Sequence, residues 1–509
     1  MPGLTRTAMM AGVAIVCVTS ASVRAESLAD AIALAYRSNP TLQAQRALQR
    51  ATDETVVSAR SGFRPSVGVS ASVGYSDAET GLKAPSHIES NSGGATLTLT
   101  QPLFNGGRTT AAVQAAEATV SAGREALRST ESSILQSVVQ AYTDVRRDQQ
   151  IVAIRQNNVR VLANQFEEVN AKFEVGQITR TDVAQSQVQL AAARALLSSA
   201  QAQLQISRAN YTAVVGQNPG ELAPEPDMPG LPPTVDQAFD TAEAESPVLR
   251  QARSTEQSSR ARIAEAKAAN HPTVSLQGSL GYSGRVSPFD PSDYNRALTA
   301  EAVVSQPLFT GGLNASNIRT ATEQNTADRL NIEGARRRVV QQVSQAWNVM
   351  ASSRANVISD GEQVRAATVA FEGAQEEYRV GLRTTLDVLI AQQNLRDAEL
   401  ALVQARHDAY VAEAAVLGAM GRLEARYLVS GVDSYDPALN SRRIRNAGAT
   451  PWDGVIEHLD ALGSPKVRLD PAATAPLPGL GAPTMLAPEP GPANRALSTS
   501  QPTTGGQPR

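Results

Sequence analysis

Gln101-Pro102-Leu103-Phe104-Asn105-Gly106-Gly107 and Gln306-Pro307-Leu308-Phe309-Thr310-Gly311-Gly312 are two versions of one seven-residue motif, 205 residues apart. A second pair of motifs keeps this offset, since Val175-Gly176 with Asp182-Val183 recurs as Val380-Gly381 with Asp387-Val388. Self-similarity at a fixed offset indicates an internal repeat. The chain therefore contains two copies of one structural unit, over about 28–216 and 235–421.

The residues before each seven-residue motif alternate between apolar and small polar side chains. The apolar positions of the first half are Val67, Val69, Ala71, Val73, Tyr75, Ala95, Leu97 and Leu99. Those of the second half are Val274, Leu276, Leu280, Tyr282, Leu298, Ala300, Ala302 and Val304. Alternation with period two predicts half-buried strands, so each half contains one strand pair. The halves differ by two residues between Tyr75 and Gln101, where we expect a loop to precede the second strand.

The residues after each motif predict long helices. Positions 103–218 and 308–436 contain no proline, and Val113, Val120, Leu127, Ile134 and Ala141 recur every seven residues, as in a coiled coil. The stretch from 107 to 175 would be ~100 Å long as a helix, at 1.5 Å per residue. The Val-Gly pairs predict the turns, after which each half returns as a second helix. Two helical hairpins and two strand hairpins thus alternate along the chain.

Composition excludes several functional classes. The 509 residues carry a formal net charge of −3, which argues against a nucleic-acid partner. The four histidines are scattered, so we expect no metal site and no cofactor. The chain has neither a nucleotide-binding Gly-rich loop nor an arguable Ser-His-Asp set, and we expect it not to be an enzyme.

The two ends of the chain differ from the repeats. Arg6, the apolar stretch 8–18 and Val23-Arg24-Ala25 predict a signal peptide at 1–25, which contains the single cysteine, Cys17. We expect the first repeat at 26–220, a Pro-rich linker at 221–233 and the second repeat at 234–423. From 465 to the end, ten of 45 residues are proline. The segment 424–509 is therefore expected to be a disordered, Pro-rich tail.

The predicted strands are suited to a membrane. They have about the length of a membrane-spanning β-strand, ~9–11 residues, with one apolar and one small polar face. A sheet in hydrocarbon must close, and one chain offers only four strands. Two copies would give 8 strands and three would give 12, with a wider lumen. A soluble sheet packed on a coiled coil is the alternative, because alternation is a weak signal in each segment.

These motifs together resemble the TolC family of outer-membrane efflux and type I secretion channel proteins, over roughly 26–423. The resemblance implies a mainly α fold with a transmembrane β-barrel. In a homotrimer, four strands per chain would form a 12-stranded barrel in the outer-membrane lipid. The long α-helical tunnel and the C-terminal tail would lie in the periplasm. It implies a passive exit duct for type I protein secretion or drug efflux, which docks a periplasmic adaptor and an inner-membrane ABC or proton-driven transporter. The alternative is a soluble periplasmic coiled-coil adaptor or structural protein.

The resemblance also implies roles for residues at the helical tips. Arg383 would reach Thr181 and Asp182 of a neighbouring chain, and Tyr378 would bond Asp182 of its own chain, to form a gate. Asp387 matches an ion-selectivity ring. One turn further on, Ile390 is apolar where a second acidic ring is expected. The adaptor would dock at Val175, Gly176, Val380 and Gly381. Apart from the resemblance, these are ordinary solvated helix ends.

Overall fold

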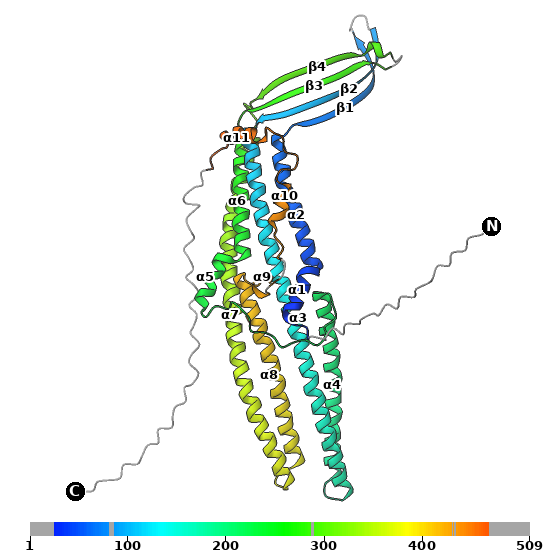
Figure 1. The fold of residues 1–509 in the computed structure, drawn as a ribbon, viewed down its shortest axis with the longest axis vertical. Coiled ribbons are helices and arrows are strands. Elements are labelled where there is room, and N and C mark those ends of the chain that lie inside the picture. The colour runs from blue at the N-terminus through cyan, green and yellow to red at the C-terminus, as the bar shows by residue number, and fades with distance from the viewer. Residues whose placement is uncertain (1–24, 81–85, 287–289, 430, 432–433, 468–509) are drawn as a thin grey trace, which may run out of the picture. The chain divides into compact units, whose positions relative to one another are not determined.

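The computed structural model describes residues 25–80, 86–286, 290–429, 431 and 434–467. The predicted signal peptide and the end of the predicted tail lie outside these residues. The first repeat consists of α1 (Leu28–Ser38), α2 (Pro40–Arg60), the 3-10 turn η1 (Ser61–Phe63), β1 (Ser66–Thr80), β2 (Ser86–Phe104), α3 (Arg108–Glu174) and α4 (Arg180–Val215) (Figure 1). The second consists of α5 (Val235–Glu245), α6 (Pro247–Ala268), β3 (Thr273–Arg285), the 3-10 turn η2 (Pro291–Asp293), β4 (Asn295–Ser305), α7 (Leu313–Arg379) and α8 (Thr385–Met420).

The helices of the two repeats match in length. Helices α3 and α7 have 67 residues each, and α4 and α8 have 36 each. The seven-residue apolar period predicted from Val113 to Ala141 is confirmed, since all five of its residues are buried. Helix α3 packs against α4 toward the tip, and against α2 and α6 toward the strands (Figure 1). One long helix is thus covered along its whole length by shorter ones.

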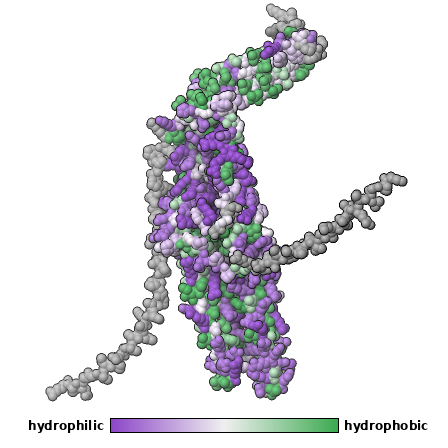
Figure 2. Space-filling view, viewed as in Figure 1, coloured by the Kyte–Doolittle hydropathy of each residue, from purple (hydrophilic) through white to green (hydrophobic). Residues whose placement is uncertain are grey.

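The four strands form one antiparallel sheet in the order β1-β2-β3-β4. Leu97 stands opposite both Val69 and Leu280, so apolar side chains meet on one face, whereas Thr96 stands opposite Ser70 and Gly281 on the other. Val69 is 75% exposed, Val73 is 78% exposed, and hydrophobic side chains gather over the sheet (Figure 2). The apolar face of the sheet is therefore uncovered in a single chain.

The loop predicted between the first two strands is shorter than expected. Strand β1 continues to Thr80 and β2 begins at Ser86, so that residues 76–80 and 86–94 are paired strand. The alternation is masked there because Asp77 and Glu89, which stand opposite each other, place charged side chains on the face that carries valine and leucine farther along the sheet. The two extra residues of the first repeat therefore lengthen a strand hairpin.

The prediction of a disordered tail is wrong for residues 424–467. Residues 424–467 include α9 (Ala425–Leu428), α10 (Ala438–Ile444) and α11 (Asp453–Leu462). This segment is held by side chains of the first repeat: Arg46 lies over the rings of both Tyr36 and Tyr435, and Arg64 pairs with Asp453 at 3.1 Å. Composition averaged over the whole tail concealed this ordered part, because nine of the twelve prolines of 424–509 lie beyond it.

The connection between the repeats is irregular, as its proline content predicts. Glu26 and Leu222 form an isolated parallel bridge, and the hydroxyl of the buried Tyr142 donates to the carbonyl of Ala223 at 2.7 Å. The linker is therefore fixed on the helices. Within the described ranges, no helix combines the length and the hydropathy needed to cross a membrane.

Candidate functional site

The helical hairpins end in two turns of the same construction. In the first, the N–H of Gly176 donates to Phe173 and that of Gln177 to Lys172, both at 2.9 Å. Gly176 has a φ of 74°, a left-handed conformation in which a residue with a Cβ is strained. The second turn repeats the pattern around Gly381, with a φ of 81°. These hydrogen bonds are those of a Schellman motif, and they explain why glycine follows valine at both tips.

Each return helix begins with a capping box that the sequence analysis missed. The side chain of Thr179 caps the first turn of α4 and donates to the Asp182 carboxylate at 2.7 Å. Thr384 and Asp387 repeat this arrangement on α8, at 2.8 Å. The signal was present in the sequence as Thr-x-x-Asp at both positions. Asp182 and Asp387 thus have a structural role in their own chain.

The predicted gate residues contact other partners within the single chain. The guanidinium of Arg383 pairs with the Glu377 carboxylate at 2.6 Å. The hydroxyl of Tyr378 accepts from the Lys172 ammonium at 3.3 Å, and this ammonium lies 4.6 Å from the centre of the tyrosine ring. Among the described residues, no hydrogen bond joins Tyr378 to Asp182. Tyr378 instead connects α7 to α3, through a lysine that the sequence analysis did not single out.

The remaining tip residues are accessible. Val175 is 69% exposed and Val380 is 70% exposed, and no atom lies within 4 Å of a Cβ built on Gly176 or Gly381. Thr181 is also exposed. The apolar rims of both turns are therefore free to meet another protein.

A groove of about 710 Å³ lies between α7 and α8 just above the tip. One wall is made of small residues, Ala366, Ala367, Ala370, Gly373 and Ala374. Arg383, Asp387 and Ile390 line it as well, so the predicted ring residue and its apolar successor lie in one surface.

Electrostatics keep these tip groups charged. Hydrogen bonds from the backbone and hydroxyl of Thr384, with a smaller contribution from Arg383, hold the pKa of Asp387 below its usual range. The hydrogen bond to Glu377 raises the pKa of Arg383. The bonds to Glu168 and Tyr378 likewise raise the pKa of Lys172. The tips therefore carry fixed charges over the pH range of a living cell.

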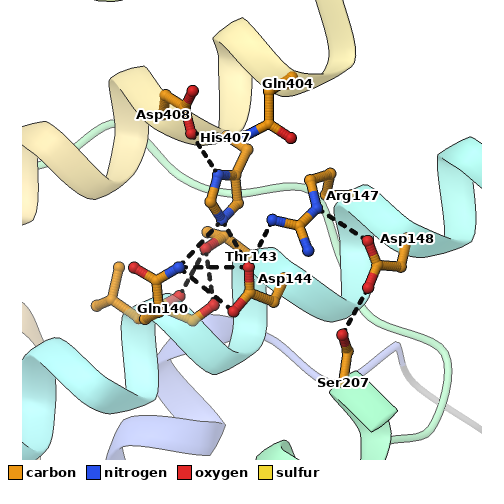
Figure 3. A network of polar contacts seen from close by, with 10 residues as sticks. Gln140, Thr143, Asp144, Arg147, Asp148, Ser207, Gln404, His407 and Asp408 are labelled. Atoms are coloured by element: carbon orange, nitrogen blue, oxygen red, sulfur yellow. Dashed lines mark hydrogen bonds and ion pairs between the residues drawn. The ribbon is translucent and has the colours of Figure 1, made fainter. Parts of the chain in front are cut away.

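A buried polar network joins the hairpins farther from the tips (Figure 3). His407 on α8 lies 2.9 Å from Asp144 on α3 through Nε2, and 2.9 Å from Asp408 through Nδ1. Arg147 bridges Asp144 and Asp148, at 2.8 Å from each. Ser207 on α4 donates to Asp148 at 2.5 Å. Helices α3, α4 and α8 are therefore connected by side chains whose pairing no sequence spacing reveals.

His407 is held in its charged form by this network. Burial opposes the charged ring, but the hydrogen bonds to Asp144 and Asp408 outweigh it, and the pKa of His407 is raised. For Asp144, burial is outweighed by the bond to His407 and by the charge of Arg147, and its pKa is lowered. A second buried contact lies closer to the tip, where Gln392 on α8 donates to Asn158 on α3 at 3.1 Å.

Over the described ranges, no cluster of three His, Cys, Asp or Glu side chains is arranged to hold a metal ion. The acidic pairs Glu167-Glu168 and Glu376-Glu377 include exposed ion-pair partners: Glu168 pairs with Lys172 and Glu376 with Arg379.

Comparisons with known proteins agree with this architecture. The family model described as outer membrane efflux protein matches residues 31–217 and 238–422, which are the two repeats. The chain is 34% identical to the outer membrane efflux protein BepC of Brucella suis, over 84% of this chain and 92% of that protein. It is 25% identical to the outer membrane protein TolC of Escherichia coli, over 87% and 92%.

Solved structures share the fold. The outer membrane protein VceC of Vibrio cholerae superimposes with a TM-score of 0.65 at 22% identity, covering 77% of this chain and 96% of that one. The outer membrane channel CmeC of Campylobacter jejuni gives 0.68 at 17% identity, covering 82% and 88%. The predicted fold class, mainly helical with a strand sheet that contributes to a barrel, is therefore confirmed.

The family match also decides between the two functional hypotheses. It covers both strand pairs and both helical hairpins, which favours a duct over a soluble periplasmic adaptor. The family is one of channels and not of enzymes, and its members lie in the outer membrane with a helical tunnel in the periplasm. This chain belongs to the outer membrane efflux protein family and is an exit duct of the outer membrane.

Proposed function

We propose that three copies of this chain form the duct, with a gate at the helical tips. The observation that carries the proposal is the sheet, which has one apolar face and two edge strands, β1 and β4, without a partner in the described chain. Unpaired edges are not tolerated in hydrocarbon, so β4 of one copy pairs with β1 of the next. Three copies give 12 strands, wide enough for a water-filled lumen.

The gate works by exchange of ion-pair partners. In the closed trimer, Arg383 leaves or shares Glu377 and reaches Thr181 and Asp182 of the neighbouring chain. Tyr378, which contacts Lys172 at the boundary of the two hairpins, is close enough to the tip to stabilise the same closed arrangement. Exposed ion pairs contribute about 0–1 kcal/mol each, so three copies hold the tip closed without making it hard to open.

Asp387 forms the entrance ring. Its Oδ2 is engaged by Thr384, so the carboxylate is fixed in orientation and remains charged. Three such carboxylates around an axis attract cations and disfavour anions. Ile390, 50% exposed in the same groove, replaces a second acidic ring and makes the constriction more apolar.

The partners are a periplasmic adaptor and an inner-membrane transporter. The adaptor docks on the exposed tips at Val175, Gly176, Val380 and Gly381, and a helix of the adaptor packs in the groove lined by small residues between α7 and α8. An adaptor that binds the open state better by a few kcal/mol is sufficient to open the gate.

The proposed cargo is small molecules. A relative that is 34% identical to this chain is named as an efflux protein. Protein secretion is the second candidate, since the chain is 26% identical, over 62% of its length, to the alkaline protease secretion protein AprF of Pseudomonas aeruginosa. Deletion of the gene distinguishes them: increased drug susceptibility supports efflux, whereas loss of a secreted protein with unchanged susceptibility supports secretion.

The trimer is tested by cysteine cross-linking, because the only cysteine of the chain lies in the predicted signal peptide. Val69→Cys on β1 is combined in turn with Leu298→Cys, Ala300→Cys and Ala302→Cys on β4. We expect one combination to give a ladder of dimer and trimer on non-reducing gels. Only monomer in every combination, from protein that is folded by circular dichroism, contradicts closure through these strands.

A further inference from the structure

Helix α11 carries an exposed apolar stripe that no part of the proposed duct mechanism uses. Trp452, Val455, Leu459 and Leu462 are spaced by three, four and three residues, so they share one face of the helix. They are 48%, 64%, 45% and 76% exposed. Glu457 lies on the opposite face. An in-line set of large apolar side chains on a short amphipathic helix requires an apolar environment.

The helix is fixed in place by the face next to the stripe. Ile456 is buried against Phe63 and Val113. The carboxylate of Asp460, 1% exposed, accepts hydrogen bonds from the N–H groups of Asn105 and Gly107 at 2.8 and 3.0 Å. It also accepts from the N–H and hydroxyl of Thr110, at 3.0 and 2.9 Å. This one carboxylate thus caps the start of α3 and holds α11 at the junction of sheet and helices (Figure 1).

The stripe continues the apolar face of the sheet. Gln101 follows Leu97 and Leu99 at intervals of two, and its partner across the sheet is Leu276, 45% exposed. The Gln101 side chain is therefore on the apolar face. The indole N–H of Trp452 donates to Gln101 Oε1 at 3.2 Å. Trp452 thus lies where the apolar face of the sheet ends and the helices begin.

We propose that α11 is an in-plane anchor, which lies in the periplasmic leaflet of the outer membrane with its apolar stripe among phospholipid headgroups and upper acyl chains. A short helix with one apolar and one polar face inserts only to that depth. A tryptophan at the edge of the apolar band matches the preference of indole rings for the membrane interface. The lipid face of the sheet and the stripe of α11 then form one continuous surface.

A second copy of the chain is the competing occupant of the stripe. Helix α11 packs on β2, α3 and η1, and β2 is an inner strand of the sheet. Copies that join through the edge strands β1 and β4 meet on either side of it. The position of α11 therefore favours lipid, and the experiment below distinguishes the two.

The test uses Trp452 as its own probe. Trp347, the second of the two tryptophans, is replaced in a Trp347→Phe variant of the full-length protein, reconstituted into phosphatidylcholine–phosphatidylglycerol vesicles. We expect lipids with a nitroxide near the headgroup to reduce Trp452 emission more than lipids labelled at the acyl terminus, and aqueous iodide to have little effect. Quenching by iodide without quenching by labelled lipid overturns the proposal, as does protection from both, which indicates a protein cover.

Two control variants, both without Trp347 and Trp452, calibrate the quenching for a tryptophan in water and for one in the acyl chains. Glu457→Trp, on the opposite face of α11, is expected to be quenched by iodide and not by labelled lipid. Val73→Trp, on the apolar face of the sheet, is expected to respond to the deep label. If labelled lipid quenches neither Val73→Trp nor Trp452, the sheet is not in the bilayer and the anchor proposal is overturned with it. If labelled lipid quenches Val73→Trp but not Trp452, the anchor proposal is overturned and the barrel proposal stands.

Discussion

The guanidinium of Arg383 lies 2.6 Å from the carboxylate of Glu377 in its own chain, across the tip turn between α7 and α8. Arg379 pairs with Glu376 at 2.7 Å within α7, and both pairs are exposed. Two arginines therefore form exposed ion pairs near one tip, and only Arg383 is assigned to the proposed gate. This difference allows a controlled test.

The first prediction concerns the gate. Arg383→Ser combined with Tyr378→Phe removes the side-chain groups that we assign to the proposed gate, so we expect a higher single-channel conductance in planar bilayers. Arg379→Ser is the matched control and should leave conductance unchanged. Glu377→Gln frees Arg383 for its neighbour and should lower the fraction of time spent open. Equal conductance of the double variant and the parent, in a folded trimer, rejects the assignment.

The second prediction concerns selectivity. Asp387→Asn removes three charges from the entrance of a trimer, and the ratio of cation to anion permeability, measured from reversal potentials in a salt gradient, should fall. The variant also weakens the capping box, so Thr384→Val serves as the control that loses the cap and keeps the charge. If both variants change selectivity equally, the cap and not the ring is responsible.

The third prediction concerns pH. The pKa of His407 is raised in the folded chain, so its charged form stabilises the fold below the pKa of the unfolded chain, and this stabilisation is lost as pH rises through the folded value. Asp144 and Asp408 favour the charge and Arg147 opposes it. We expect the Tm to fall as the pH is raised above about 6.5, the ordinary pKa of histidine.

A variant of His407 identifies the source of that dependence. His407→Gln should have a lower Tm at pH ~6 and a flatter profile above it. His458→Gln, which alters an exposed histidine, should retain the parent profile. At acid pH the sign reverses for Asp144: its lowered pKa contributes stability that is lost as pH falls, fully in the parent and in His458→Gln, and less in His407→Gln, which lacks the hydrogen bond from His407. A parental slope in His407→Gln would assign the dependence to another group.

The fourth prediction concerns the tip turns. Gly176→Ala and Gly381→Ala place a Cβ in a left-handed conformation, at a cost of about 1–2 kcal/mol, although no atom crowds the position. We expect reduced efflux in a complementation assay of drug susceptibility, because the surface that meets the adaptor is distorted. Gly230→Ala, in the linker, has the same strain at a φ of 81° with no atom within 4 Å. Equal loss of efflux in that control would mean that the effect is on folding and not on docking.

The fifth prediction concerns the docking of α11. Asp460→Ala leaves the N–H groups of Asn105, Gly107 and Thr110 without their shared acceptor, and bonds to a charged group are worth about 1.5–3 kcal/mol each. Limited proteolysis should cleave after residue 424 sooner than in the parent. Glu457→Ala, at an exposed position of the same helix, should not accelerate cleavage.

Much of the fold follows from the sequence because its signals are periodic. The recurrence of valine, leucine and isoleucine every seven residues in α3 gives the coiled coil, and the offset of 205 residues gives the repeat. The extension of β1 and β2 was missed, since Asp77 and Glu89 interrupt the alternation that defines a strand. The order of 424–467 was missed because it depends on Asp460 and Trp452 meeting residues about 350 positions earlier.

The site was less accessible to sequence reasoning. The identity of the tip residues came from motifs, but their partners depend on which helices lie side by side. Glu377 and Lys172 had no signal beyond their charge. The network of His407 joins α8 to α3 across 263 positions, and no local pattern encodes such a contact. The capping boxes are the exception, since Thr-x-x-Asp is a local signal that was overlooked.

The two tip turns have one further consequence. Each satisfies its own backbone groups, through the Schellman bonds of one helix and the capping box of the next. Neither turn depends on a main-chain hydrogen bond from the other turn. The tips of the proposed gate can therefore separate and come together again while each turn stays folded. Opening and closing of the proposed gate therefore exchanges only side-chain contacts in water, and the backbone of the helical ends stays unchanged.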